Sequence, residues 1–113
     1  MYLERGQIFL KLNKGQESIK DLDKAVMLNS SEKMAYFNRA EAHYLLHELN
    51  EAITDLEKCI RLDEKFGKGH YRLAQIALEI NHNRANRDIC LHLKSALSQG
   101  CPEAKPLINK VCR

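Results

Sequence analysis

The chain has 113 residues, 44% of them hydrophobic, and a formal net charge of +3, which fits one soluble domain with a core of its own. Five glycines and two prolines are too few for collagen-like or flexible low-complexity classes, and they disfavour a turn-rich β-sandwich. The longest apolar run, 25–28, is too short to predict a membrane span, and the interleaved charges form no basic stripe that predicts a nucleic-acid partner.

Seven helices are predicted, because apolar residues recur every three or four positions between short polar turns. Their expected ranges, in chain order, are 2–13, 16–28, 33–47, 50–62, 67–80, 85–98 and 103–112. Gly15 marks the first turn, and Asn50 is a predicted N-cap because its side chain can accept hydrogen bonds from free N–H groups. Gly100 suits the end of the sixth helix, and Pro102 suits the first turn of the seventh.

A shift of 34 residues aligns the first two helix pairs with each other. Over positions 2–29 this gives nine identities, against about two expected from composition. The identical pairs are Tyr2/Tyr36, Arg5/Arg39, Leu12/Leu46, Glu17/Glu51, Ile19/Ile53, Asp21/Asp55, Leu22/Leu56, Lys24/Lys58 and Leu28/Leu62. In the third pair, the second helix comes three residues late, because the linker 81–86 absorbs an insertion. The sequence therefore predicts an internal repeat with a period of 34 residues.

The repeat defines the predicted domain organisation. Three repeats are expected at about 1–31, 32–65 and 66–100, followed by a capping helix at 103–112, all within a single domain. Gly6, Ala40 and Ala74 occupy equivalent positions and are small, which indicates that two helix backbones approach closely there. A helix pair has an exposed apolar side that only a stacked neighbour buries, so about three repeats are needed for stability.

This pattern resembles the tetratricopeptide repeat (TPR) family, whose helix–turn–helix unit carries W-x2-L-G-x2-Y and then A-x3-F. The matching stretches are Tyr2-x2-Arg5-Gly6-x2-Phe9 and Ser18-x3-Leu22, Tyr36-x2-Arg39-Ala40-x2-His43 and Ala52-x3-Leu56, and His70-x2-Leu73-Ala74-x2-Ala77. The resemblance implies an all-α fold, a right-handed α-solenoid of three antiparallel helix pairs with a seventh capping helix. The stretch 90–112 also resembles the C-terminal cap of bacterial TPR proteins.

The resemblance further implies a non-enzymatic module that binds a peptide or a partner helix in a concave groove. The expected groove residues lie on the first helix of each pair, at Leu3, Gln7, Leu10, Phe37, Asn38, Glu41, Tyr44, Lys68, Tyr71, Arg72 and Gln75. For Phe37 and Tyr71, packing against the neighbouring repeat is the alternative. The alternative is that the chain is a fragment, the architectural C-terminal end of a longer repeat array, with the binding site elsewhere.

Another alternative is a degenerate carboxylate clamp for the acidic C-terminal tails of chaperones. Asn38, Lys68 and Arg72 resemble part of that clamp, and the two cations are one helical turn apart. Leu3 and Gln7 stand where the clamp has a lysine and an asparagine. We therefore expect a looser preference for acidic peptides at the third repeat.

The cysteines divide into two kinds. Cys59 takes the place of Ala25, so a buried thiol is expected there. Cys90 and Cys112 lie at similar distances from the turn at 98–103, so antiparallel packing of the last two helices would bring them level. A disulfide, two neighbouring thiols and coincidence all remain open. A disulfide would indicate an oxidising compartment, and the sequence leaves cytoplasm and periplasm equally open.

No catalytic, cofactor or metal site is predicted. His43 and His47 are one turn apart, but the glutamate of H-E-x-x-H is missing, and His43 takes a packing position in the repeat. His70, His82 and His92 have no partner at ligand spacing. The expected partner is a protein or peptide, and an exposed first repeat would allow a homodimer.

Overall fold

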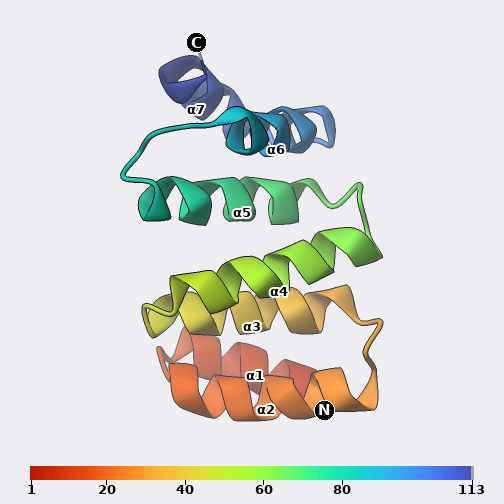
Figure 1. The fold of residues 1–113 in the computed structure, drawn as a ribbon. Helices are drawn as coiled ribbons and strands as arrows, with labels where there is room; N and C mark the ends of the chain where they lie inside the picture. Colours follow the sequence, from red (N-terminus) through yellow and green to blue (C-terminus); the bar gives the residue numbers. More distant parts are fainter. Residues whose placement is uncertain (113) are drawn as a thin grey trace. The chain divides into compact units, whose positions relative to one another are not determined.

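The computed structural model describes residues 1–112, and within them it contains seven α-helices and no strand. The helices are α1 (Tyr2–Lys11), α2 (Gly15–Leu28), α3 (Lys33–Leu45), α4 (Leu49–Leu62), α5 (Gly67–Ile80), α6 (Arg87–Ser98) and α7 (Ala104–Val111) (Figure 1). The predicted all-α helical-repeat fold is confirmed, and each helix end lies within two residues of its expected position.

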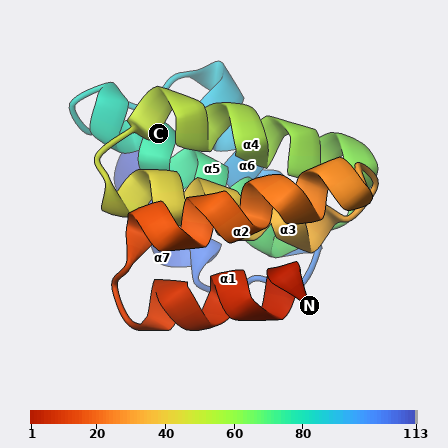
Figure 2. The ribbon, with the colours of Figure 1, turned by 90° about the horizontal axis from the view of Figure 1, so that it is seen from below.

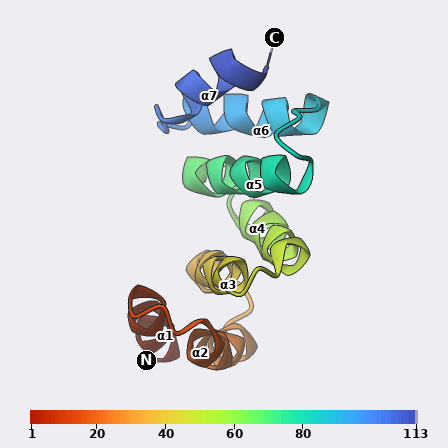
Figure 3. The same ribbon diagram turned by 90° about the vertical axis from the view of Figure 1, so that its left-hand side faces the viewer.

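The described residues form two compact units. The first, Met1–Leu62, holds α1 to α4 and therefore the first two repeats, and the second begins at Asp63 and holds α5 to α7. In the first unit, α1 packs on α2, α3 packs on α4, and α3 contacts both helices of the first pair (Figures 2 and 3). In the second unit, α6 packs against both α5 and α7. The single-domain organisation stays a prediction.

The first helix of each pair ends in the same kind of turn. A backbone N–H donates to the carbonyl oxygen five residues earlier, and the residue before the donor has a positive φ. The donors are Lys14, Glu48 and Asn83, and the positive-φ residues before them are Asn13, His47 and His82. This Schellman turn satisfies a carbonyl at the helix end and lets the chain reverse.

Two residues that were predicted to mark turns lie inside helices instead. Gly15 is the first residue of α2, where an added Cβ would lie 3.1 Å from the side chain of Leu46. Asn50 is the second residue of α4, so it is not the N-cap. The Schellman turns explain both errors, because they end the preceding helix one or two residues earlier than expected. Gly100 has a φ of 90° just beyond α6, which agrees with its predicted role.

The two helices of the first repeat approach closely at Gly6. A Cβ added to Gly6 would lie 2.7 Å from Cγ of Leu22, which is fully buried on α2. The Ser18 hydroxyl donates a hydrogen bond of 2.8 Å to the carbonyl oxygen of Gly6. In the second repeat, Ala40 and Leu56 take the places of Gly6 and Leu22, and both are fully buried. A small residue on the first helix therefore sets the spacing of the pair.

An arginine–aspartate pair also joins the helices of each of the first two repeats. Arg5 donates two hydrogen bonds of 2.7 Å to Asp21, and Arg39 donates two, of 2.9 and 2.8 Å, to Asp55. Bidentate pairs of this kind are strong because both partners are charged. The hydrogen bonds from Arg5 lower the pKa of the Asp21 carboxyl, and those to Asp55 raise the pKa of Arg39.

The third repeat joins its helices differently. Nδ1 of His70 lies 2.9 Å from Nδ1 of His92, and Nε2 of His70 lies 2.9 Å from the carbonyl oxygen of Glu64. Because a carbonyl can only accept, His70 donates from Nε2, and in the neutral form of His70 its Nδ1 accepts the N–H of His92. Metal-ligand spacing in the sequence does not pair these histidines, because they are 22 positions apart and the packing of α5 on α6 brings them together.

The close approach at Gly6 predicts the sign of one substitution. In an exposed helix, replacing glycine with alanine stabilises by about 1 kcal/mol. Here the added methyl group must displace Leu22, so we expect Gly6→Ala to lower the free energy of unfolding by about 1–3 kcal/mol in urea titrations. Leu22→Val provides the control in a double-mutant cycle, because the shorter side chain should relieve part of the effect. A Gly6→Ala variant more stable than the native chain would contradict the close approach.

Candidate functional site

In the first unit, the predicted groove residues lie on α1 and α3, which contact each other. Leu3, Gln7 and Leu10 follow one face of α1 and are half-buried. Glu41 and Tyr44 of α3 are also half-buried. The first helices of two successive repeats thus carry side chains that remain partly accessible to a ligand.

Phe37 and Asn38 of α3 are more deeply placed, each about 8% exposed. Little of the Phe37 ring is accessible, which favours the packing alternative for this residue. The amide nitrogen of Asn38, Nδ2, is buried and has no hydrogen-bond partner among the described residues. An unpaired buried donor costs about 1–3 kcal/mol, so the Asn38 amide nitrogen is a destabilising group in the described structure.

In the second unit, the predicted residues lie on α5. Lys68 is exposed, whereas Tyr71, Arg72 and Gln75 are half-buried. Nη1 of Arg72 donates a hydrogen bond of 3.3 Å to the side-chain oxygen of Gln75, which orients the guanidinium along the helix. Lys68 and Arg72 are one turn apart, so both cations extend from the same side of α5. The predicted groove residues therefore form two sets, one in each unit.

The histidines of the first unit take structural positions. Nδ1 of His43 lies 2.8 Å from a carboxylate oxygen of Glu48, and its Nε2 lies 3.6 Å from Asp55, so His43 joins α3 to α4 as a packing residue. His47 has a φ of 61° in the turn. Within residues 1–112, no three His, Cys, Asp or Glu side chains gather as a metal ion would require.

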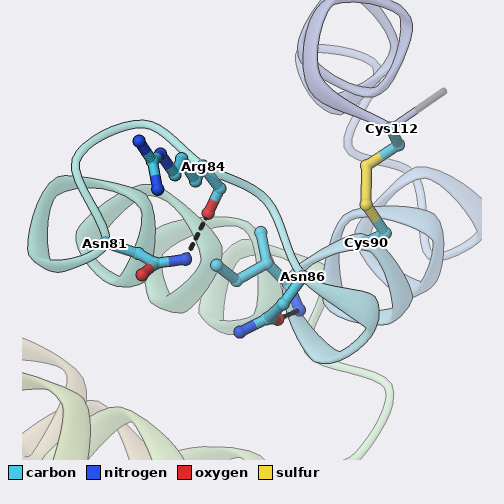
Figure 4. The surroundings of a disulfide bond; sticks show 6 residues. Asn81, Arg84, Asn86, Cys90 and Cys112 are labelled. Atoms are coloured by element: carbon cyan, nitrogen blue, oxygen red, sulfur yellow. Dashed lines mark hydrogen bonds between the residues drawn. A yellow bond between two sulfur atoms is a disulfide. The ribbon is translucent and has the colours of Figure 1, made fainter.

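Cys90 of α6 and Cys112, just beyond α7, form a disulfide with Cα atoms 5.9 Å apart (Figure 4). This is the pair whose state the sequence left open. Cys59 is fully buried, as predicted. Burial and the Glu103 carboxylate, which accepts a hydrogen bond from Cys101, raise the pKa of the Cys101 thiol to about 11. The disulfide therefore ties α7 to α6, while Cys101 stays protonated.

Breaking this disulfide should destabilise the second unit. The bond closes a loop with a sequence separation of 22 residues, for which chain entropy predicts a stabilisation of about 3 kcal/mol. We expect the double variant Cys90→Ser/Cys112→Ser to lose about that much free energy of unfolding relative to the oxidised chain. Adding dithiothreitol should lower the native chain to the same stability and leave the variant unchanged. Cys101→Ser is the control, and a native chain insensitive to dithiothreitol would contradict the prediction.

Large apolar side chains are exposed on the first repeat. Ile8 of α1 and Leu12, just beyond its end, are 56% and 58% exposed, and Met27 and Leu28 of α2 are 83% and 75% exposed. One repeat later, Ala42 takes the place of Ile8 and is fully buried on α3, which packs on α2. The face of α1 that carries Ile8 thus corresponds to a face of α3 that is buried. The homodimer predicted through this repeat stays a prediction.

Within the described chain, no helix has the length and apolar character that crossing a membrane would need.

In the first two repeats, antiparallel helix pairs recur with one period and one kind of close contact, and all three first helices end in the same kind of turn. This arrangement defines a helical-repeat protein. Two sequence models, both described as tetratricopeptide repeat, match residues 1–32 and 34–66. The chain therefore belongs to the tetratricopeptide repeat family, as its sequence pattern predicted. The likeness of its cap to bacterial members stays a prediction.

Two curated relatives match part of this chain. The Hsp70-Hsp90 organizing protein 3 of Arabidopsis thaliana is 40% identical over 73 residues, which are 65% of this chain and 13% of that protein. The U-box domain-containing protein 70 of Oryza sativa subsp. japonica is 36% identical over 75 residues, 66% of this chain and 9% of that protein. The matched part of this chain thus spans about a tenth of the length of these relatives.

Solved structures share the fold at low sequence identity. The second TPR domain of human RPAP3, in complex with the HSP70 peptide SGPTIEEVD, has a TM-score of 0.86 and 19% identity over 99% of this chain and 92% of that chain. The Arabidopsis OM64 TPR domain has a TM-score of 0.85 and 21% identity over 96% of this chain and 89% of that chain. These likenesses establish the helical-repeat fold.

Proposed function

We propose that this TPR chain is a non-catalytic protein-interaction module whose ligand is an extended acidic peptide with a free C-terminal carboxylate. The first helix of each repeat carries the contacts to the peptide. In the first two repeats, the second helix holds the first in place through the small-residue contact and the arginine–aspartate pair; in the third, the pair of His70 and His92 joins the helices.

The unpaired amide of Asn38 is the observation that carries this proposal. Nearly all buried donors in folded proteins have a hydrogen-bond partner, so an exception needs an explanation. Asn38 is about 8% exposed on α3, among the residues expected to face the ligand. A peptide carbonyl or carboxylate oxygen would supply the missing acceptor.

The preference for an acidic peptide rests on α5 of the second unit. Arg72 offers a planar fork that matches a carboxylate, and Lys68 offers a mobile point charge one turn away. Tyr71 lies between them in sequence and is half-buried, which adds apolar contact area. These contacts belong to a different unit from Asn38, and each set is tested by its own substitutions.

The similar structures support this choice of ligand. The RPAP3 domain is bound to a peptide that ends in Glu-Glu-Val-Asp, and the first TPR domain of Spaghetti (RPAP3) is bound to an HSP90 peptide, SRMEEVD, with the same ending. In this chain, Leu3 and Gln7 replace a lysine and an asparagine expected of a complete clamp. We therefore propose a looser acidic preference, weaker than a complete clamp provides.

A second candidate function is architectural, in which the chain stacks against a further repeat. The exposed Ile8 and Leu12 favour it, because the equivalent position on α3 is buried by packing on α2. In that case the apolar face of α1 would be the contact surface, and substitutions on α3 and α5 would leave the interaction unchanged.

Calorimetry with the peptide SGPTIEEVD tests the acidic-peptide proposal. Lys68→Glu and Arg72→Glu should each lower the affinity roughly ten- to a hundredfold, because each removes a charge-assisted contact worth about 1.5–3 kcal/mol. Asn38→Leu should also lower the affinity while leaving the free energy of unfolding equal or higher, since the native amide nitrogen is buried with no hydrogen bond to lose.

Two controls distinguish these contacts from a general effect of charge on the affinity. Lys94→Glu, on the exposed side of α6, makes the same charge change away from the expected contacts and should leave the affinity within about twofold. The C-terminally amidated peptide should bind more weakly than the free acid. Equal binding of an uncharged scrambled peptide would contradict the acidic preference.

A further inference from the structure

The second unit contains a hollow between the linker 81–86 and α7, which we call the cap hollow. Its volume is about 540 Å³, within the usual range for ligand sites. Its large apolar lining residues, which we call the floor, are Leu78, Leu107 and Val111, and Arg84 and Lys110 are also among the residues that line it. The three floor residues also belong to or pack against the core of this unit, so the floor is anchored.

The charge at the cap hollow has one sign. Neither the Arg84 guanidinium nor the Lys110 ammonium forms an ion pair with any residue that the structure describes, and both residues are exposed. No acidic side chain is among the residues lining the hollow. Two unpaired cations beside an apolar floor are complementary to a ligand that combines an apolar group with negative charge.

Features that distinguish the third repeat build the cap hollow. In the linker, Asn83 has a positive φ in addition to that of His82, whose positive φ recurs at the equivalent turn of the other two repeats. The amide of Asn81 donates to the carbonyl oxygen of Arg84, which fixes the linker (Figure 4). The disulfide begins one residue after Val111 and holds α7 on α6. The two walls of the hollow are thus each held by a local constraint.

We infer that the cap hollow binds a peptide segment of a partner protein in which a bulky apolar residue is flanked by acidic residues. The apolar side chain lies on the floor, and the flanking carboxylates pair with Arg84 and Lys110. A peptide fits better than a lipid tail, because the exposed linker leaves the hollow open to water and a tail needs an enclosed apolar tunnel. This site shares no residue with the contacts proposed on α3 and α5, so it goes beyond the proposed function.

Fluorescence anisotropy with a labelled, C-terminally amidated peptide, GSDELEDSG, which lacks the free carboxylate proposed to bind at α5, tests this inference on the oxidised chain. We expect binding that falls roughly five- to tenfold in Arg84→Glu and in Lys110→Glu, as loss of charge-assisted contacts implies. Replacing the leucine of the peptide with serine, or its acidic residues with amides, should weaken binding to a similar degree. Amide NMR shifts on titration should centre on Ala85 and Val111.

Lys105→Glu is the matched control, because Lys105 is an exposed lysine of α7 that does not line the hollow. It should bind the peptide like the native chain, and Asn38→Leu and Lys68→Glu should do the same, which separates this site from the proposed function. Reduction of the disulfide should weaken binding. Equal loss in Lys105→Glu, equal binding of the serine peptide, or binding of oleate without binding of the peptide would each overturn the inference.

Discussion

The close approach of the two helices within a repeat is the constraint on which the rest of the structure depends. At Gly6 the backbone of α1 comes so near Leu22 that a methyl group does not fit without displacement. The bidentate pair of Arg5 and Asp21 then fixes the rotation of one helix on the other. With the second helix locked in this way, the first helix presents a constant face, on which the proposed ligand contacts such as Asn38 lie.

The second unit keeps the helix pairing but replaces the means of holding it. Leu73 takes the place of Arg39, and the hydrogen-bonded pair of His70 and His92 joins α5 to α6 instead. An insertion lengthens the linker, and a disulfide from Cys90 ties the last helix down. The third repeat therefore differs from the first two in chemistry while it retains their topology, and the same differences create the cap hollow.

The repeat period predicted the helices well, because apolar spacing and a 34-residue shift are both local properties of the sequence. The arginines and aspartates of these pairs are identical between the first two repeats. Identity between repeats does not reveal, however, which residues of one repeat contact each other. The insertion hid His92, which takes the place of Asp55 only when three extra residues are counted. The unpaired state of Asn38 could not be predicted, because it depends on every neighbour that fails to supply an acceptor.

The central claim is that the first helices carry the ligand and the second helices only hold them. Its most direct test is an NMR titration of the labelled chain with SGPTIEEVD, observed at the side-chain amide of Asn38. We expect this resonance to move as the amide gains a hydrogen bond, together with backbone signals of α5 around Lys68 and Arg72. Shifts confined to α2, α4 and α6, with the Asn38 amide unchanged at saturation, would contradict the claim.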